Sequence, residues 1–354
     1  MKSGKIFFFV ALFLWLVTQV QPGMAQKMIG PHGYLTFEAE ISSKDSVGRR
    51  GTFDLHHFNV LGDYLLNQNM RVFGEIEWEH GTDSEAYEPG GTQAGFVRLE
   101  RAWFEYEPTP GLKLRFGKFL TPYGIYNEIH DAAPAYDTSI LPQSIYGKHM
   151  NPFGRNQRFY AKFSIGIQLL SKIEIGESFF EFKTLLSNGR GKKPFEQDDN
   201  ADKGIGFRLL GDIQPLQLKI GYSFYTDKNG AAFDTRQTSH AIDLRFERNR
   251  WRWTVELARS SLQTPNGPHS SRVANAGYAE LAYHISQWQT LIARYDLFDP
   301  DQHLANELER DFTLGTSIYL LKQVVVKAEV HFWHQPQIDN ENYLLAISSL
   351  AVVF

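Results

Sequence analysis

Short segments of the chain alternate between apolar and polar residues along much of its length. In the segment that begins at Leu35, the apolar residues Phe37 and Ile41 alternate with the polar residues Thr36 and Glu38. The same period of two recurs in residues 70–79, 112–116, 216–224, 242–247, 253–257, 291–296 and 326–332. Alternation over about ten residues is typical of transmembrane β-barrel strands, in which one face meets lipid and the other faces the lumen.

Strands of a soluble β-sandwich also alternate, so the lengths of the connections must distinguish the two architectures. Short connections are predicted at 67–69, 108–111, 171–176, 212–215, 249–250, 286–287 and 321–323. Longer connections are predicted between them, at 42–51, 81–94, 118–158, 187–204, 226–238, 260–272, 299–309 and 335–341. Short periplasmic turns with longer external loops are typical of outer-membrane barrels. The pattern therefore predicts an all-β fold, a transmembrane antiparallel β-barrel of about 16 strands. This count changes by two if the irregular segments 54–66 and 158–173 divide differently.

The longest connection, 118–158, contains four prolines and four tyrosines and has no sustained helical or alternating pattern. Loops of about 40 residues are uncommon in compact domains and are usually functional. Prolines restrict the freedom of such a loop, and tyrosines supply apolar rings with hydroxyl tips. We therefore expect this loop to fold into the lumen and form a constriction.

Residues 1–25 have the organisation of an export signal. Two lysines precede an apolar run at 6–20, and small residues follow at Gly23 and Ala25. The alternative is a retained membrane helix, but the run is short and precedes a cleavage-like sequence. The sequence thus predicts a cleaved signal peptide and a barrel formed by 26–354.

Charge and cysteine content exclude several classes of protein. The chain has 36 Lys and Arg, 40 Asp and Glu and a net charge of −4, which becomes −6 without the two lysines of the signal. This mildly acidic balance does not indicate a nucleic-acid surface. The chain has no cysteine, so neither disulfides nor thiolate metal ligands are available.

The C-terminal segment predicts a final strand. Leu350, Val352 and Phe354 fall on one face of it, together with Leu344 and Ala346. A last strand that ends in an aromatic residue resembles the sorting signal read by the outer-membrane assembly machinery. We therefore expect that machinery to be a partner of the chain.

Two stretches resemble the large superfamily of Gram-negative porins, which includes the phosphate-selective porins. They are AWFEYEPTPGLKLRFGKFLTPYGI at 102–125, and LIARYDLFDP at 291–300 with the following TLGTSIYLLKQVVVKAEVHF at 313–332. The most characteristic part is the run from Gly117 to Gly124. In such porins the loop after the fifth strand folds into the barrel and narrows it, and here that loop is 118–158. The resemblance implies an outer-membrane location, contact with lipids and lipopolysaccharide, and a homotrimer.

The predicted pore and constriction residues lie in and around this loop. They are Arg115, Lys118, Tyr123, Glu128, Asp131, Asp137, Lys148, Arg155 and Arg158. With Lys162, the cations outnumber the acids, which predicts a mild preference for anions. The alternative is that these cations pair with acids of the lumen wall such as Glu75, Glu77 and Glu105. No run of arginines alternates with apolar residues as a phosphate ladder would require.

The histidines at 56–57, at 130 and 149, and at 331 and 334 lie in no spacing typical of a metal site, so no metal or cofactor is predicted. The run Ser187-Asn188-Gly189-Arg190 resembles one in an outer-membrane phospholipase, where a catalytic histidine stands two residues before the serine. Leu185 occupies that position here, so the activating base is missing.

The predicted function is a porin for passive diffusion of small hydrophilic solutes or ions, and not an enzyme. A barrel enzyme of the outer membrane and a secreted soluble β-rich binding protein are the alternatives.

Overall fold

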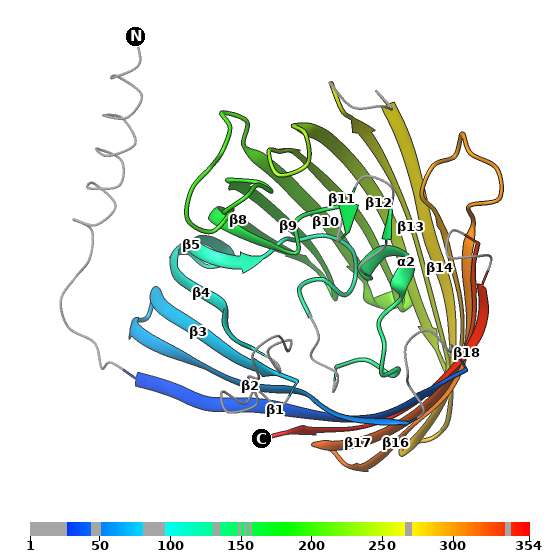
Figure 1. The fold of residues 1–354 in the computed structure, drawn as a ribbon. Coiled ribbons are helices and arrows are strands. Elements are labelled where there is room, and N and C mark those ends of the chain that lie inside the picture. Colours follow the sequence, from blue (N-terminus) through cyan, green and yellow to red (C-terminus); the bar gives the residue numbers. More distant parts are fainter. Residues whose placement is uncertain are drawn as a thin grey trace, which may run out of the picture.

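The fold is given by a computed structural model that describes residues 27–43, 51–80, 96–129, 135–147, 150–151, 154–155, 158–265, 271–336 and 341–354. Within these residues, sixteen strands form one closed antiparallel barrel (Figure 1). The predicted strand count and fold class are therefore confirmed. The predicted signal peptide lies outside the described residues.

The barrel strands are β1 (Lys27–Ser42), β2 (Thr52–Asn67), β3 (Met70–Glu79), β4 (Phe96–Thr109), β5 (Leu112–Leu120), β8 (Phe163–Ile175), β9 (Ser178–Ser187), β10 (Gly204–Ile213), β11 (Leu218–Asn229), β12 (Thr235–Arg248), β13 (Trp251–Gln263), β14 (Ser271–Ser286), β15 (Gln289–Asp299), β16 (Glu309–Leu321), β17 (Val324–Gln335) and β18 (Glu341–Val353). The connections hold the short helix α2 (Gln143–Tyr146), the 3-10 helix η3 (Gln214–Leu216) and a two-stranded ribbon of β6 (Met150–Asn151) and β7 (Gly154–Arg155). No helix in the described part of the chain is long and apolar enough to cross a membrane.

The two faces of the barrel wall differ in polarity, as the alternation predicts. On β13, Leu257 is 61% exposed on the outer surface, whereas its neighbour Glu256 is fully buried on the inner surface. On β17, Phe332 is exposed and His331 is fully buried. Because the sheet is closed, an outer face of large apolar side chains matches lipid, and the polar groups are confined to the interior.

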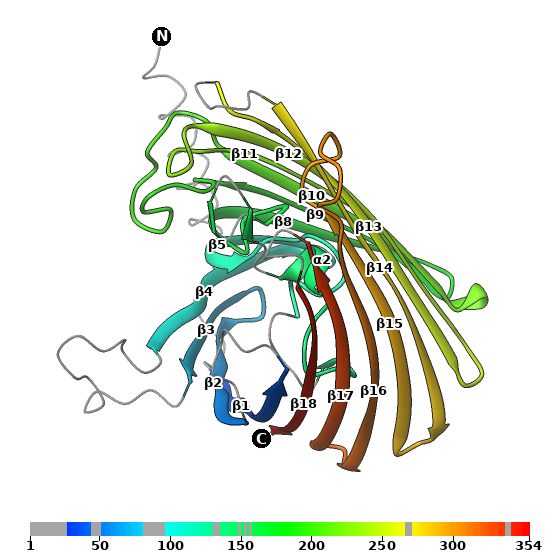
Figure 2. The same cartoon turned by 45° about the vertical axis from the view of Figure 1, so that its right-hand side comes forward.

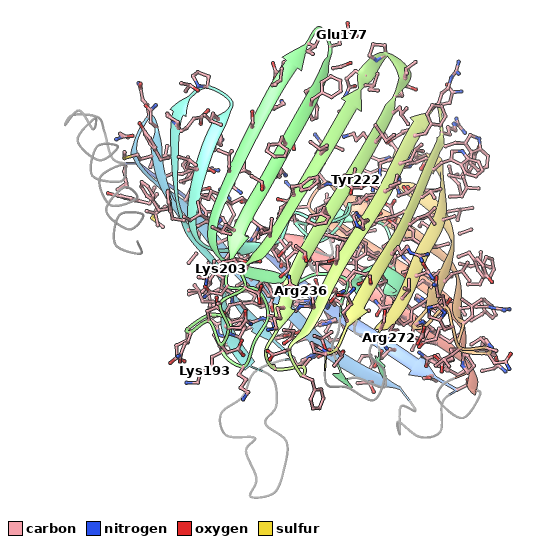
Figure 3. The ribbon with its side chains drawn as sticks, turned by 90° about the horizontal axis from the view of Figure 1, so that it is seen from above. Glu177, Lys193, Lys203, Tyr222, Arg236 and Arg272 are labelled. Atoms are coloured by element: carbon pink, nitrogen blue, oxygen red, sulfur yellow. The ribbon has the colours of Figure 1, made fainter. Side chains whose placement is uncertain are left out.

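Seven connections of two to four residues lie between consecutive strands, at 68–69, 110–111, 176–177, 214–217, 249–250, 287–288 and 322–323. Figure 3 shows Glu177, in one of these turns, at the opposite end of the barrel from Lys193 and Lys203 in the β9–β10 loop. Figure 2 shows β10 to β17 side by side as successive hairpins. The predicted alternation of short turns and longer loops is thus confirmed.

Two of the predicted long connections are shorter than expected. Strands β11 and β12 continue to Asn229 and from Thr235, which leaves a loop at 230–234 in place of 226–238. Strands β13 and β14 similarly narrow the 260–272 connection to 264–270. The reason is that polar residues at these strand ends still pair across the ladder, as Thr226 does with Thr238. Because these paired residues are polar, the alternation of apolar and polar residues does not predict their pairing.

Strands β1 and β18 close the barrel with the register Leu35 to Val352 and Phe37 to Leu350. At its end, Phe354 exchanges two backbone hydrogen bonds with Gly33, of 2.8 and 2.9 Å. The ring of Phe354 stacks on Phe58, with 5.8 Å between ring centroids.

Candidate functional site in the barrel lumen

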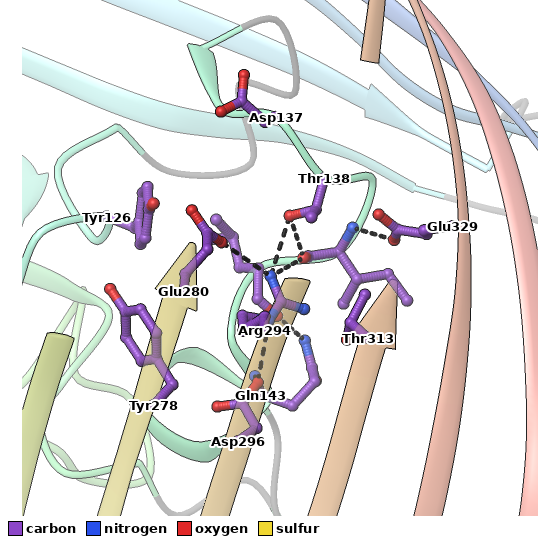
Figure 4. Close-up of polar contacts among 12 residues, drawn as sticks. Tyr126, Asp137, Thr138, Gln143, Tyr278, Glu280, Arg294, Asp296, Thr313 and Glu329 are labelled. Carbon is purple, nitrogen blue, oxygen red and sulfur yellow. Dashed lines mark hydrogen bonds and ion pairs between the residues drawn. The ribbon is translucent and has the colours of Figure 1, made fainter. Parts of the chain in front are cut away.

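Residues 121–129 and 135–147 of the loop after β5 lie inside the barrel, where they contact the inner wall, chiefly from β11 to β18 (Figures 1 and 4). At β11, the Gly124 backbone N–H donates to Ser223 Oγ at 3.0 Å. Tyr146, in α2, donates its hydroxyl to Glu256 on β13 at 2.6 Å. Since the acceptors lie on separate strands, the loop is fixed across a broad part of the wall.

Glu329 on β17 holds the loop near its middle. Its carboxylate accepts the backbone N–H groups of Ser139 and Ile140, at 2.8 and 3.0 Å. The hydroxyl groups of Ser139 and Ser349, on β18, lie 2.8 Å apart. These contacts pair backbone groups of the loop with polar wall groups, which a loop buried in the lumen requires.

Arg294 on β15 is fully buried and points toward the same part of the loop (Figure 4). Its Nη1 donates to Thr138 Oγ1 at 3.0 Å and to the Ile140 carbonyl at 3.1 Å. Its charge is compensated by Asp296 at 3.3 Å and Glu280 at 3.7 Å. Charge-assisted contacts of this kind are stronger than neutral hydrogen bonds.

Tyrosines form the apolar part of the docked loop. Tyr123 is fully buried and stacks on Tyr160, with ring centroids 4.4 Å apart. Tyr126 packs edge-on against Tyr136 and Tyr146. Burial raises the pKa of Tyr126 to about 12, so its phenol stays protonated at neutral pH. The loop therefore carries a small core of its own within the lumen.

A second group of side chains lies on the inner face of β3 to β5. This group, the arginine wall, consists of Arg71, Arg98, Arg101 and Arg115. Arg115 pairs with Glu105 at 2.5 Å, Arg98 with Glu77 at 2.5 Å, Arg71 with Glu105 at 2.8 Å, and Arg101 with Glu75.

The arginine wall is layered. The four arginine side chains are 18–30% exposed, whereas Glu75, Glu77 and Glu105 are at most 4% exposed. The guanidinium groups also lie over aromatic rings: Arg115 and Arg71 are 4.4 and 4.9 Å from the ring centre of Trp103, Arg101 is 5.0 Å from that of Phe73, and Arg98 is 6.0 Å from that of Phe163. The carboxylates are thus at the base of the wall and the guanidinium groups face the lumen. Arg115 pairs with the wall acid Glu105, which is the alternative that the sequence analysis gave for the predicted pore cations.

Glu128 links the loop to β9 through Lys183, at 2.8 Å. Burial alone would raise the pKa of Glu128, but the attraction of Lys183, together with that of Arg208 and Arg115, outweighs it and holds the pKa below its usual value. Nearby, Lys183 and Arg115 border a hollow of about 660 Å³ that also includes Lys113 and Leu170.

The predicted pore residues occupy different positions in the structure. Arg115, Glu128 and Asp137 lie on the lumen side, each in an ion pair; the partner of Asp137 is Arg252. Tyr123 belongs to the core of the loop. The carbonyl of Arg158 accepts hydrogen bonds from Arg190 and Gln237, at 3.3 and 3.0 Å. Asp131 and Lys148 lie outside the described residues, and of Arg155 only the backbone, in β7, is described.

The prediction for Lys118 is wrong. Phe119 packs inward against Phe73 and Trp103, so its neighbour Lys118 points to the outer face. There Lys118 Nζ donates to the Leu99 carbonyl at 2.5 Å and lies 4.5 Å from the ring centre of Phe195. Sequence proximity to the loop suggested a lumen position, but the period of two decides the direction of the side chain.

Arg98 and Arg101 were missed because they are three positions apart, which on a regular strand means opposite faces. A bulge between the pairs Glu75–Arg101 and Ile76–Leu99 adds one residue to β4 and brings both arginines to the inner face. Arg71 was visible in the alternation of β3 but was not connected to them. Arg294 and Arg252 also alternate inward, on β15 and β13.

Of the histidines named in the sequence analysis, those that the structure describes lie in different parts of the barrel. His331 lies between Asp311 at 2.7 Å and Glu329 at 3.0 Å, and His334 contacts Asn342 at 2.7 Å. His130 and His149 lie outside the described residues. His56 and His57 stack on each other and belong to a larger group at one end of the barrel.

Comparisons with known proteins address the fold. No family model matches the chain. An anion-selective porin from Comamonas acidovorans has 12% sequence identity and a TM-score of 0.66, with 93% of this chain and 100% of that chain covered. The chain has the porin fold.

Two further solved structures share this porin fold. The trimer form of OmpT, an outer membrane protein of Vibrio cholerae, has 11% identity and a TM-score of 0.62, covering 94% of this chain and 100% of that one. The outer membrane channel DcaP of Acinetobacter baumannii has 9% identity and a TM-score of 0.61, covering 95% and 99%. At these identities the likeness concerns the fold.

In sequence, 131 residues are 31% identical to an uncharacterized protein of Aquifex aeolicus (strain VF5). This match covers 36% of the chain and 27% of that relative. The matched segment therefore spans about a quarter of the relative's length.

Proposed function

We propose that the chain is an outer-membrane porin through which small hydrophilic solutes and ions diffuse passively. The observation that carries this proposal is the position of loop residues 121–129 and 135–147, which bind the inner wall of β11 to β18, while the arginine wall lies on β3 to β5. The passage runs between these two surfaces. Its width is set by the loop, and its field by the side chains that remain in contact with water.

The arginine wall supports a mild preference for anions. Its acids are buried beneath the arginines, so a passing ion meets the guanidinium groups first. The near balance of opposite charges keeps this preference modest, although low-dielectric walls strengthen the field that remains. The segment 102–125, which resembles the porin superfamily that includes the phosphate-selective porins, contains Arg115, so phosphate is an anion to test.

The test is single-channel recording in a planar bilayer with a gradient of KCl. We expect steady, voltage-independent conductance at low potentials and a reversal potential on the anion-selective side. A salt gradient of potassium phosphate then measures phosphate against chloride. Folded protein that inserts into the bilayer without conducting would contradict the porin function, and a reversal potential on the cation side would contradict anion preference.

The proposal includes no enzymatic activity. Ser187 Oγ accepts the Gly189 backbone N–H at 3.2 Å and lies 3.4 Å from the Gly204 carbonyl, which are contacts of a strand end that turns back. Leu185, at the position of the missing base, is buried in an apolar cluster. A secreted soluble protein is disfavoured by the outer surface, where large side chains such as Leu257 and Phe53 are more than half exposed.

The proposed location is the outer membrane of a Gram-negative bacterium, reached through a cleaved signal peptide and the outer-membrane assembly machinery. The apolar outer face would contact lipids and lipopolysaccharide. We also propose a homotrimer, supported by the trimer form of the Vibrio cholerae neighbour. Cross-linking in native membranes would show trimers, and monomers alone would contradict this assembly.

A further inference from the structure

Six ionisable side chains gather where β2 begins and β3 ends. Because the short β2–β3 turn is at the other end of these strands, the group lies at the end of the barrel that carries the long loops. We call this group the histidine cluster; its members are Glu38, Asp54, His56, His57, Glu79 and His80.

A bulge in β2 creates the cluster. His57 pairs with Thr36 and Leu55 pairs with Phe37, so His56 is an extra residue without a counterpart on β1. On a regular strand His56 and His57 would point to opposite faces, but a bulge redirects one of the two side chains. Their rings stack with centroids 4.0 Å apart and an interplanar angle of 17°.

His80 completes the cluster from the end of β3. It has a left-handed backbone conformation, with φ of 57°, which is uncommon for residues other than glycine. Its ring lies 5.2 Å from that of His56 and is nearly parallel to it, at 16°. Three imidazoles from adjacent strands are thereby held side by side.

Carboxylates surround the three rings in two roles. Glu38 lies 2.8 Å from His56 Nδ1, and Asp54 lies 2.8 Å from His80 Nδ1. A carboxylate that holds one ring nitrogen orients the other nitrogen toward a metal, as in carboxylate–histidine–zinc groups. Glu79 Oε1 lies 3.8 Å from both His57 Nε2 and His80 Nε2.

These distances fit a metal ion after a small contraction. The ligand atoms of Asp54, His56 and His80 lie within 4.8 Å of one another, as do those of His56, His57 and Glu79. In a tetrahedral zinc site with bonds of about 2.0–2.1 Å, ligand atoms are roughly 3.3 Å apart. The 3.8 Å separations at Glu79 therefore need to shorten by about 0.5 Å, and separations at the 4.8 Å limit by about 1.5 Å, which side-chain rotation can supply.

We propose that the histidine cluster binds one divalent transition-metal ion such as Zn²⁺, with His56, His57, His80 and Glu79 as ligands and with Glu38 and Asp54 orienting the imidazoles. Imidazole-rich sites favour zinc, copper and nickel, whereas calcium and magnesium prefer sites of oxygen ligands alone. This proposal replaces the expectation from the sequence that these histidines form no metal site. The proposal can be tested without measuring conduction; Glu79 also accepts a hydrogen bond from Arg98 of the arginine wall, at 2.8 Å, through its other carboxylate oxygen.

The test is calorimetric titration of ZnCl₂ into the full-length, untagged, metal-free protein folded in detergent. We expect one saturable equivalent of Zn²⁺ and no comparable binding of Mg²⁺. The double variant His56→Ala/His80→Ala should bind Zn²⁺ at least about 100-fold more weakly, since it loses two ligands. The matched control is His303→Ala, which removes an exposed histidine of the β15–β16 loop and should bind like the unchanged protein.

Two further measurements do not depend on the folding of the double variant. Cu²⁺ bound to the unchanged protein should show hyperfine coupling to several nitrogens in electron paramagnetic resonance. Glu38→Gln, which keeps every proposed ligand, should weaken Zn²⁺ binding roughly 10–100-fold. Absence of saturable Zn²⁺ binding, absence of nitrogen coupling, or equal affinity in the double variant and the His303→Ala control would overturn the proposal.

Discussion

The backbone N–H of Ser139 donates a 2.8 Å hydrogen bond to Glu329, which lies 190 positions further along the chain. The next backbone N–H, of Ile140, uses the other carboxylate oxygen at 3.0 Å. One carboxylate on β17 thus holds two consecutive residues of the loop. Because hydrogen bonds to charged groups contribute about 1.5–3 kcal/mol each, this attachment strongly limits the motion of the loop.

Glu329→Ala should loosen the loop inside the barrel. Without the carboxylate, two backbone N–H groups lose their charged acceptor, and we expect larger fluctuations of the single-channel current. Glu247→Ala is the matched control, because Glu247 is on β12, is more than half exposed and lies 4.0 Å from His284 rather than against the loop. Equal current noise in the two variants would show that Glu329 does not restrain the loop.

Shortening the loop between Ile129 and Gly147 should raise the single-channel conductance. The segment removed includes Ser139, Ser144 and Tyr146, whose contacts with the wall place it inside the lumen. Its loss widens the passage while the strands remain paired. Conductance equal to that of the unchanged protein would show that the narrowest point lies elsewhere.

The strands and their turns could be predicted from the sequence because lipid and lumen impose opposite polarity on alternate residues. Leu257 and Glu256 illustrate this rule, which needs no long-range information. The side chains of the arginine wall and of the histidine cluster depend instead on bulges in the strands. The extra residues in β2 and β4 shift the register, and this shift brings His56 beside His57 and Arg98 beside Arg101.

The partners of the loop could not be predicted for a related reason. The contact between Ser139 and Glu329 joins residues that are close only after the barrel has closed. Lys118 shows the opposite error, since it is close to the loop in sequence but faces outward. Position along the chain therefore indicated where the site would be, whereas bulges and barrel closure determined which side chains form it.

Adjacent leucines of β8 test the two faces of the wall. Leu169 pairs with the outward-facing Leu114, whereas Leu170 pairs with Lys113 and Lys183 on the inner face. Leu169→Arg, near the middle of the strand, should lower the free energy of unfolding by about 2–4 kcal/mol. Leu170→Arg enters the hollow on the lumen side and should cost less than about 1 kcal/mol. Urea unfolding in liposomes measures both values, and equal losses would contradict the assigned orientation.

Phe354→Asp should reduce assembly into the outer membrane while leaving export intact. Its ring packs on Phe58 next to the pairing of β1 with β18, and we expect it also to belong to the signal read during assembly. Phe58→Ala separates the two roles, because it removes the packing partner but keeps the terminal aromatic residue. Folded, heat-modifiable Phe354→Asp protein at normal levels in the outer membrane would contradict this prediction.

Arg101→Gln/Arg115→Gln should move the reversal potential toward cations. The substitutions remove two positive groups that face the lumen and leave the negative charges of Glu75 and Glu105 in the wall. Lys118→Gln removes a positive charge from the same region of β5, but on the outer face. It should leave the reversal potential unchanged, so the comparison separates the lumen field from the net charge of the protein.

Heat-modifiability in gel electrophoresis shows that each variant is folded before recording. If the double variant keeps the reversal potential of the unchanged protein, the arginine wall does not set the ion preference; if Lys118→Gln shifts it as much, the side-chain directions assigned to β5 are wrong.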